Sequence, residues 1–105
     1  MTHRLRPLAL VIALTPGLLF AQRAEALRRT YVIVHGAWGG GWDWHGVDSA
    51  LTARGNRAYR ATLTGLGERV HHASPSIGLA THVTVVVNAI RFENLHDVIL
   101  VGHFG

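Results

Sequence analysis

The chain has 105 residues, which is enough for one small domain. Only 15% of the residues are charged and 49% are hydrophobic, a composition that excludes a disordered chain. The net charge of +4 comes from ten basic residues, all Arg; beyond residue 26, seven Arg and five acidic residues are scattered along the chain. Nucleic-acid binding is therefore not predicted, because it needs a clustered basic face. With no Cys, disulfides, thiol catalysis and Cys-ligated zinc are excluded.

The first 26 residues have the pattern of an export signal. Arg4 and Arg6 form a basic start, residues 7–20 are almost wholly apolar, and residues 24–26 follow the small-x-small cleavage pattern. As a helix, the apolar stretch would be about 21 Å long, shorter than the ~30 Å hydrocarbon core of a bilayer. We expect cleavage near Ala26 and a secreted or periplasmic protein with no membrane contact beyond this signal. An uncleaved anchor, or a leader that packs on the domain, is the alternative.

The first predicted elements of the domain are a strand, a helix and a weak strand. Residues 31–34 form an apolar, β-branched run that ends at a His-Gly pair, which predicts a strand buried on both faces. Residues 44–54 show helical spacing of apolar side chains, with Asp43 placed as a cap or first-turn acid and Gly55 suited to the left-handed position after the helix. Residues 56–61 predict a weak strand.

The second half of the chain repeats this alternation. Residues 62–76 predict a long polar loop, and ordered loops of this length are usually functional. Apolar residues between 79 and 90 mark one face of a second helix, although the run at 84–87 has strand propensity. Residues 97–103 predict a second buried strand. Alternating strands and helices indicate an α/β fold with a parallel sheet and right-handed crossovers.

The turn made by His35, Gly36, Ala37 and Trp38 is the first candidate site. In an α/β sheet, ligands bind at the carboxyl ends of the strands, where this turn lies. A backbone N–H fixed in such a turn can stabilise an oxyanion, because the donor is in place before charge develops. The alternative is that the glycine only allows a tight turn.

Phosphate, cofactor and metal sites are not predicted. Trp44 stands where a dinucleotide-binding fingerprint needs its third glycine, and the chain has no Lys for a Walker A loop. His71, His72 and His82 lack the i, i+4 spacing with a Glu that zinc hydrolases use. We expect these three histidines to be surface or loop residues and the protein to need no cofactor.

The last predicted strand runs into Gly102, His103, Phe104 and Gly105. This sequence invites comparison with G-x-S-x-G, the sharp elbow that presents a nucleophilic serine, but the serine is missing. Either Phe104 occupies its place, or one residue has dropped out before Phe104. The serines of the chain lie elsewhere, at Ser49, Ser74 and Ser76.

Together, residues 31–38, 54–55, 62–70 and 98–103 resemble the N-terminal part of α/β-hydrolase fold enzymes. The closest branch is that of bacterial esterases similar to plant methylesterases and hydroxynitrile lyases. The resemblance implies three parallel strands in the spatial order 2-1-3 with two crossover helices, preceded by the signal-peptide helix. It also implies that the N–H of Ala37 is the first oxyanion-hole donor and that the small-molecule substrate of full-length relatives is an ester.

The departures from the family pattern lead to the functional hypothesis. Residues 27–105 are interpreted as the N-terminal portion of an α/β-hydrolase domain, truncated at the nucleophile elbow. No catalytic residue set is complete, because the nucleophilic Ser, the catalytic acid and the catalytic His of the family are absent. We predict an esterase by descent that is inactive as given. A non-enzymatic small-ligand binding module, or half of a hydrolase completed by a second chain, is the alternative.

Two further expectations depend on the same resemblance. Without a neighbouring strand, residues 97–101 form a bare apolar edge, which predicts low stability and self-association through that edge. Trp38, Trp42 and Trp44 either wall the pocket for the ester or belong to the core; the large area that an indole buries favours the core for two of the three.

Overall fold

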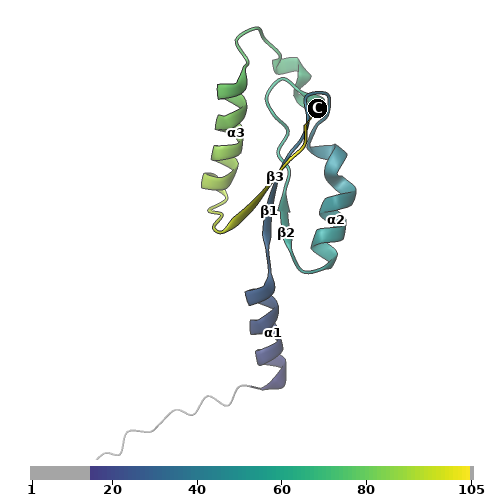
Figure 1. Cartoon of the computed structure of the whole chain (residues 1–105), viewed down its shortest axis with the longest axis vertical. Coiled ribbons are helices and arrows are strands. Elements are labelled where there is room, and N and C mark those ends of the chain that lie inside the picture. The colour runs from purple at the N-terminus through teal and green to yellow at the C-terminus, as the bar shows by residue number, and fades with distance from the viewer. Residues whose placement is uncertain (1–14, 105) are drawn as a thin grey trace, which may run out of the picture.

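The computed structural model describes residues 15–104, which form three strands and three α-helices with two short 3₁₀ turns (Figure 1). In chain order the elements are α1 (Pro16–Leu27), β1 (Thr30–Val34), η1 (Gly41–Trp44), α2 (His45–Ala53), β2 (Arg57–Tyr59), η2 (Gly67–His72), α3 (Leu79–Phe92) and β3 (Val98–Gly102).

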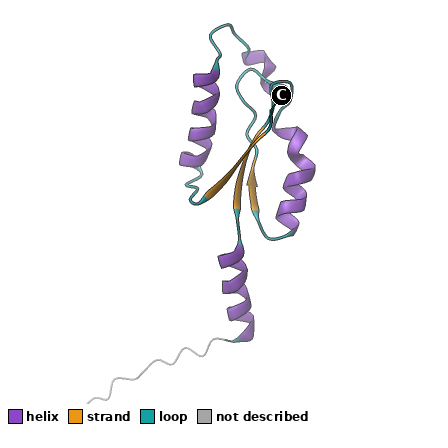
Figure 2. Ribbon diagram, viewed as in Figure 1, coloured by secondary structure: helices purple, strands orange, loops and turns teal. Residues whose placement is uncertain are grey.

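The three strands form one parallel sheet in the order β2-β1-β3. Thr30 of β1 pairs with Arg57 of β2 on one side and with Val98 of β3 on the other. The predicted α/β arrangement and strand order are confirmed. Because the chain leaves β1 in one direction and then crosses back to its other side, the two crossover helices lie on opposite faces of the sheet. Figure 2 shows α2 and α3 on either side of the strands.

The core of the described residues is small. Its buried apolar side chains are Val32 and Ile33 of β1, Leu63 of the loop after β2, and Leu95 after α3. The central strand is therefore buried, as its unbroken apolar run predicts. By contrast, the prediction that β3 is buried is wrong: Ile99 and Leu100 are 38% and 61% exposed, and within residues 15–104 β3 has a neighbouring strand on one side only.

Helix α1 projects from the end of the sheet where β1 begins (Figure 1). Its N-cap is Thr15, whose Oγ1 accepts a hydrogen bond from the N–H of Leu18 at 3.3 Å, and Pro16 occupies the first helical position. None of its residues is buried. The basic start of the predicted export signal and more than half of its apolar stretch lie outside the described residues, so export stays a prediction. No helix within residues 15–104 has the length and apolar character needed to cross a bilayer.

Local structure differs from the sequence-based expectations in three places. Strand β2 covers only Arg57–Tyr59, because the chain turns away after it to wrap over the end of β1. Asp43 does not cap α2; it lies in η1, where its Oδ2 accepts a hydrogen bond from the N–H of Gly40 at 3.3 Å. The long loop after β2 contains the 3₁₀ segment η2. Gly55 adopts the expected left-handed conformation, with φ of 85°.

Candidate functional site

The turn after β1 leaves the backbone N–H groups of Gly36, Ala37 and Trp38 without an acceptor within residues 15–104. The N–H of Gly39 donates to the carbonyl of Gly36 at 3.2 Å, which folds the chain back and places Ala37 and Trp38 at the tip. Ala37 is exposed, and its N–H has no acceptor within residues 15–104. A backbone N–H left unpaired at the carboxyl end of a central strand is available to a ligand oxygen.

His35 holds the start of this turn in place through its ring nitrogens. Its side chain is 3% exposed, and its Nε2 accepts a hydrogen bond from the N–H of Leu63 at 2.9 Å. Because Nε2 accepts, the proton of the neutral ring is on Nδ1, which lies 2.8 Å from the carbonyl oxygen of Gly36. One imidazole therefore connects the turn after β1 to the loop after β2. His35 has a positioning role here and does not face the solvent.

Thr62, in the loop after β2 and two positions after Arg60, also holds the glycine-rich segment after β1 in place. It is 6% exposed, and its Oγ1 accepts a hydrogen bond from the N–H of Gly41 at 2.9 Å. The same hydroxyl donates to Glu68, and this hydrogen bond is the main reason why the pKa of Glu68 lies below its ordinary value. The backbone and side chains of residues 60–68 thus pack against the glycine-rich segment.

Glycine is required where the two segments touch. A Cβ on Gly41 would lie 1.9 Å from the carbonyl oxygen of Arg60, and one on Gly67 would lie 3.0 Å from Cα of Gly40. Gly67 also has a φ of 51°, a left-handed conformation that side chains rarely adopt. Glycine at positions 41 and 67 therefore allows the two loops to pack closely.

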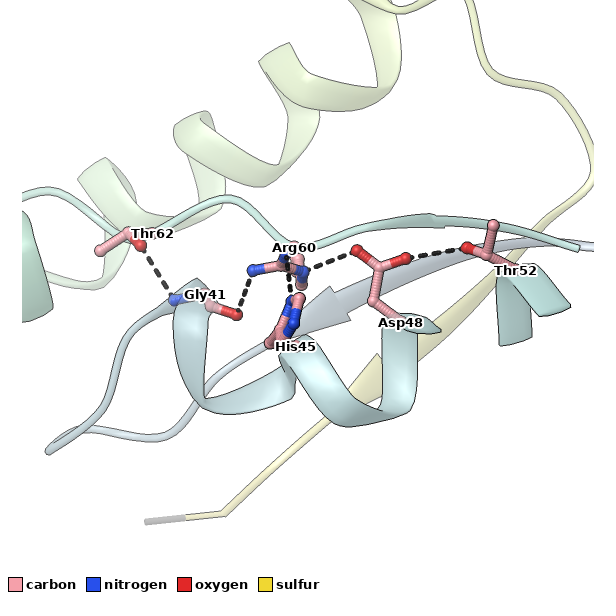
Figure 3. A network of polar contacts seen from close by, with 6 residues as sticks. All are labelled: Gly41, His45, Asp48, Thr52, Arg60 and Thr62. Carbon is pink, nitrogen blue, oxygen red and sulfur yellow. Dashed lines mark hydrogen bonds and ion pairs between the residues drawn. The ribbon is translucent and has the colours of Figure 1, made fainter. Parts of the chain in front are cut away.

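A polar network ties the same segment to α2 (Figure 3). The guanidinium of Arg60 donates from Nε to Oδ2 of Asp48 at 2.7 Å and from Nη1 to the carbonyl of Gly41 at 3.0 Å. Its Nη2 lies 3.4 Å from Nδ1 of His45, and Asp48 also accepts a hydrogen bond from Thr52 at 3.0 Å. The hydrogen bond from Arg60 holds the pKa of Asp48 below its ordinary value of 3.8.

Two cavities flank the turn. One, of about 700 Å³, lies between α3 and the sheet and is lined mainly by apolar side chains, together with His35, Gly36, Ala37, His103 and Phe104. The other, of about 450 Å³, is lined by Gly36, Trp38, Gly39, Asp43, Trp44, Val47 and His103. His103 borders both, and its ring meets that of Trp44 edge-on, with centroids 5.7 Å apart and an interplanar angle of 67°.

The structure thus brings the two predicted motifs together. The turn at Ala37 and the end of β3 at His103 and Phe104 line the same 700 Å³ cavity, although they are far apart in the sequence. Gly102 ends β3, and Gly105 lies outside the described residues. None of the three serines lines either cavity: Ser49 lies on α2, and Ser74 and Ser76 hydrogen-bond to each other in the loop before α3.

The preference for a core position of two tryptophans is wrong. Trp38, at the tip of the turn after β1, is 95% exposed, and Trp42, in η1, is 57% exposed. Only Trp44 is partly covered, and it lies against His103.

The histidines singled out in the sequence do not form a metal site. His71 and His72 are exposed in η2, with ring centroids 4.0 Å apart. His82 is neither fully exposed nor in a loop: it lies on α3 and lines the larger cavity, with its Nδ1 buried and unpaired within the described residues. Residues 15–104 contain no group of three or more His, Asp or Glu side chains that could hold a metal ion.

Sequence reasoning missed the supporting residues Thr62, Arg60 and Asp48. The i, i+4 spacing of Asp48 and Thr52 was a signal for a hydrogen bond on a helix surface. No local pattern identifies Arg60 or Thr62, because Asp48 and Gly41 are 12 and 21 residues away from them and meet them only once the sheet has formed.

The fold and the site define an α/β arrangement with a candidate functional turn at the carboxyl end of its central strand. Over 73 residues the chain is 45% identical to a carbendazim hydrolyzing esterase of Nocardioides sp. (strain SG-4G). The match covers 70% of this chain and 30% of that relative, so the chain spans about a third of its length. This similarity indicates an esterase-like relationship. No family model matches the chain, and no solved structure matches it.

Proposed function

We propose that this chain is an esterase-like α/β-hydrolase segment that binds the carbonyl oxygen of a small ester and does not turn it over by itself. We place the segment in the bacterial esterase branch that is similar to plant methylesterases and hydroxynitrile lyases. We assign the N–H of Ala37 as the first donor to the oxyanion. The esterase-like relationship supports the class of ligand.

The observation that carries this proposal is the free N–H of Ala37 at the mouth of an apolar cavity. The donor has no acceptor among the described residues, and the cavity beside it is large enough for a small ester. Hydrogen bonds of His35 and Thr62 hold the backbone on both sides of this turn, so the donor is positioned before a ligand arrives. Preorganised donors of this kind stabilise developing negative charge without rearrangement of solvent.

Turnover needs a group that attacks the carbonyl carbon, and no serine, cysteine or threonine lines the larger cavity within residues 15–104. His103 is present at the end of β3, but it has no serine beside it to activate. A site that keeps a donor and lacks the nucleophile retains binding and loses most of the rate. We therefore propose carbonyl and carboxylate binding without hydrolysis as the activity of the isolated chain, Gly102 to Gly105 being the remnant of the elbow.

Two measurements on the purified chain test this. In the first, hydrolysis of a short-chain chromogenic ester is compared between the wild-type chain and Ala37→Pro, which removes the donor. We expect equal background rates; wild-type turnover above the variant would show that the chain is an active enzyme.

The second measurement is a titration with butyrate followed by amide chemical shifts. We expect the Ala37 amide resonance to move most and the shifts to saturate. Ala37→Pro should bind at least about tenfold more weakly, because one hydrogen bond to a charged oxygen contributes about 1.5–3 kcal/mol. Gly78→Ala is the matched control, since Gly78 lies in another loop and an added Cβ there meets no atom within 4 Å. If Ala37→Pro and the control bind butyrate equally, Ala37 is not the donor.

A further inference from the structure

Both ends of the turn that carries the Ala37 donor are held by two adjacent residues of the loop after β2. At the start of the turn, the N–H of Leu63 donates to Nε2 of His35 at 2.9 Å. At its end, the N–H of Gly41 donates to Oγ1 of Thr62 at 2.9 Å (Figure 3). Both hydrogen bonds are buried and do not compete with water, so the position of this loop determines the position of both ends of the turn.

The hydroxyl of Thr62 has a single hydrogen, and the direction of that hydrogen decides how the oxygen meets Gly41. The hydrogen is donated to the carboxylate of Glu68. The oxygen then presents only lone pairs to the N–H of Gly41, which is the arrangement that a donor needs. An ionised acceptor also polarises the hydroxyl, which makes its oxygen a better acceptor in turn. Glu68 therefore acts on the glycine-rich segment through one hydroxyl group.

The backbone on either side of this contact brings the carboxylate of Glu68 against the glycines. Gly67 has a left-handed φ of 51°, and a Cβ on it would lie 3.0 Å from Cα of Gly40. A Cβ on Gly40 would in turn lie 3.0 Å from Oε2 of Glu68. Glu68 is an exposed residue, so the absence of these two side chains is what lets its carboxylate lie directly beside the segment.

Neutralisation of a neighbouring cation does not explain Glu68. It forms no ion pair within residues 15–104, and the adjacent Arg69 instead donates from Nη1 to the carbonyl oxygen of Thr62 at 3.2 Å. Two consecutive residues of η2 thus hold Thr62, one at its hydroxyl and one at its carbonyl. Glu68 lines neither of the two cavities, so it touches no ligand there.

We propose that Glu68 is a positioning residue for the Ala37 donor: through the hydroxyl of Thr62 it fixes the N–H of Gly41, and with it the far end of the turn. The inference rests on the proposed function for the ligand that Ala37 binds. The series of hydrogen bonds from Glu68 to Gly41 can be tested without any ligand.

The first test follows hydrogen exchange at single amides of the ligand-free chain. Glu68→Ala should speed exchange at Gly41 by about two- to tenfold, the range for the loss of one hydrogen bond. Glu68→Gln keeps an acceptor for the hydroxyl and should restore most of the protection. The amide of Arg57, which donates to the carbonyl of Arg29 at 2.8 Å where the strands begin, should not change. Glu93→Ala removes the same exposed side chain after α3 and is the control.

Two outcomes of this measurement would overturn the proposal. Equal acceleration at Gly41 and Arg57 would mean that Glu68 only stabilises the fold as a whole. Exchange at Gly41 that is the same in Glu68→Ala as in the Glu93→Ala control would mean that Glu68 does not act on this amide.

The second test asks whether the effect passes through Thr62. Thr62→Val removes the hydroxyl and keeps nearly the same side-chain shape. In that background Glu68→Ala should have no further effect on exchange at Gly41, because the group that links the two residues is already gone. Additive effects of the two substitutions would show that Glu68 acts by another route.

A titration with butyrate separates this inference from the proposed function. Where the wild-type chain binds butyrate, Glu68→Ala should bind it about two- to tenfold more weakly, and Glu68→Gln should restore most of the affinity. Unchanged affinity in Glu68→Ala would show that Glu68 does not position the Ala37 donor. A wild-type chain that does not bind butyrate contradicts the proposed function alone, and exchange at Gly41 still decides whether Glu68 holds the turn.

Discussion

At the scale of single residues, His35 shows how a side chain can act on the site without touching a ligand. It is almost fully buried, accepts a hydrogen bond from Leu63 and lies against the carbonyl of Gly36. A buried N–H that loses its acceptor costs more than the hydrogen bond contributed, because the group is no longer solvated. The geometry around Ala37 therefore depends on His35.

Replacing His35 by Leu is expected to lower the free energy of unfolding by about 1–3 kcal/mol, because the N–H of Leu63 becomes a buried unpaired donor. His35→Gln, which retains an acceptor of similar reach, should recover part of this loss. Urea denaturation gives the free energies, and hydrogen exchange at Leu63 reports the local effect. Equal stability of the wild-type chain and the Leu variant would show that the hydrogen bond is not formed in solution.

A pair of glycines tests close packing in the same way. Gly41→Ala should destabilise the chain by about 1–3 kcal/mol, because its Cβ would clash with the carbonyl of Arg60. Gly46, at the start of α2, has no atom within 4 Å of an added Cβ, so Gly46→Ala should stabilise by up to about 1 kcal/mol through helix propensity. The measurement is the denaturation midpoint of both variants. Shifts in the same direction would contradict the packing described for Gly41.

Asp48 gives a pH dependence with a defined sign. Its pKa in the folded chain is lowered by the hydrogen bond from Arg60, so the stabilisation is complete above the ordinary value of 3.8 and is lost as the pH falls below it. Asp48→Asn should therefore destabilise the chain at pH 7, by no more than about 1 kcal/mol because the pair is partly exposed, and this deficit should shrink as the pH falls from 3.8 toward 2.

Urea denaturation at the two pH values measures this difference. Glu25→Gln, which removes a more exposed ion pair with Arg28 on α1, is the control and should change little at either pH. A deficit of Asp48→Asn that persists at the acidic pH would show that its cause is not the charge on Asp48.

At the scale of elements, the sequence predicts most of the fold because each strand and helix has its own periodicity. Helix α3 forms as expected despite the β-branched run at 84–87, since its apolar spacing places one side against the sheet. The short extent of β2 and the exposed β3 were harder to foresee. Both depend on which strands lie beside them, and that information is not local.

The candidate site, too, could be predicted from the sequence only in part. The turn after β1 and the end of β3 are marked by short motifs next to strands, so their meeting at one edge follows from parallel topology. The supports from Thr62 and Arg60, and the outward position of Trp38 and Trp42, are set by tertiary packing. Hydrophobicity alone favoured burial of the indoles, but Trp38 on the turn and Trp42 in η1 are both exposed.

At the scale of the whole molecule, the small core matters most. Four apolar side chains are buried among the described residues, and much of the apolar surface of α3 and β3 is open. A chain this short buries only about 60% of its surface even in a complete domain.

Helix α1 is expected to contribute little to that stability, because none of its residues is buried. Removal of residues 1–26 should change the free energy of unfolding by less than about 0.5 kcal/mol. Urea denaturation of both forms at one protein concentration checks this. A larger loss would mean that the leader packs on the domain. Export is a separate question: fusion of residues 1–26 to a reporter should direct secretion, with cleavage near Ala26.

The edge-on contact between Trp44 and His103 also makes the molecule optically informative. With Trp38 and Trp42 replaced by Phe, Trp44 becomes the single emitting indole, and it is adjacent to the junction of the two cavities. Any event that rearranges the end of the last strand, whether occupancy by a small acid or contact with another polypeptide, should change its emission spectrum. Trp44 is thus an intrinsic fluorophore beside the candidate functional site.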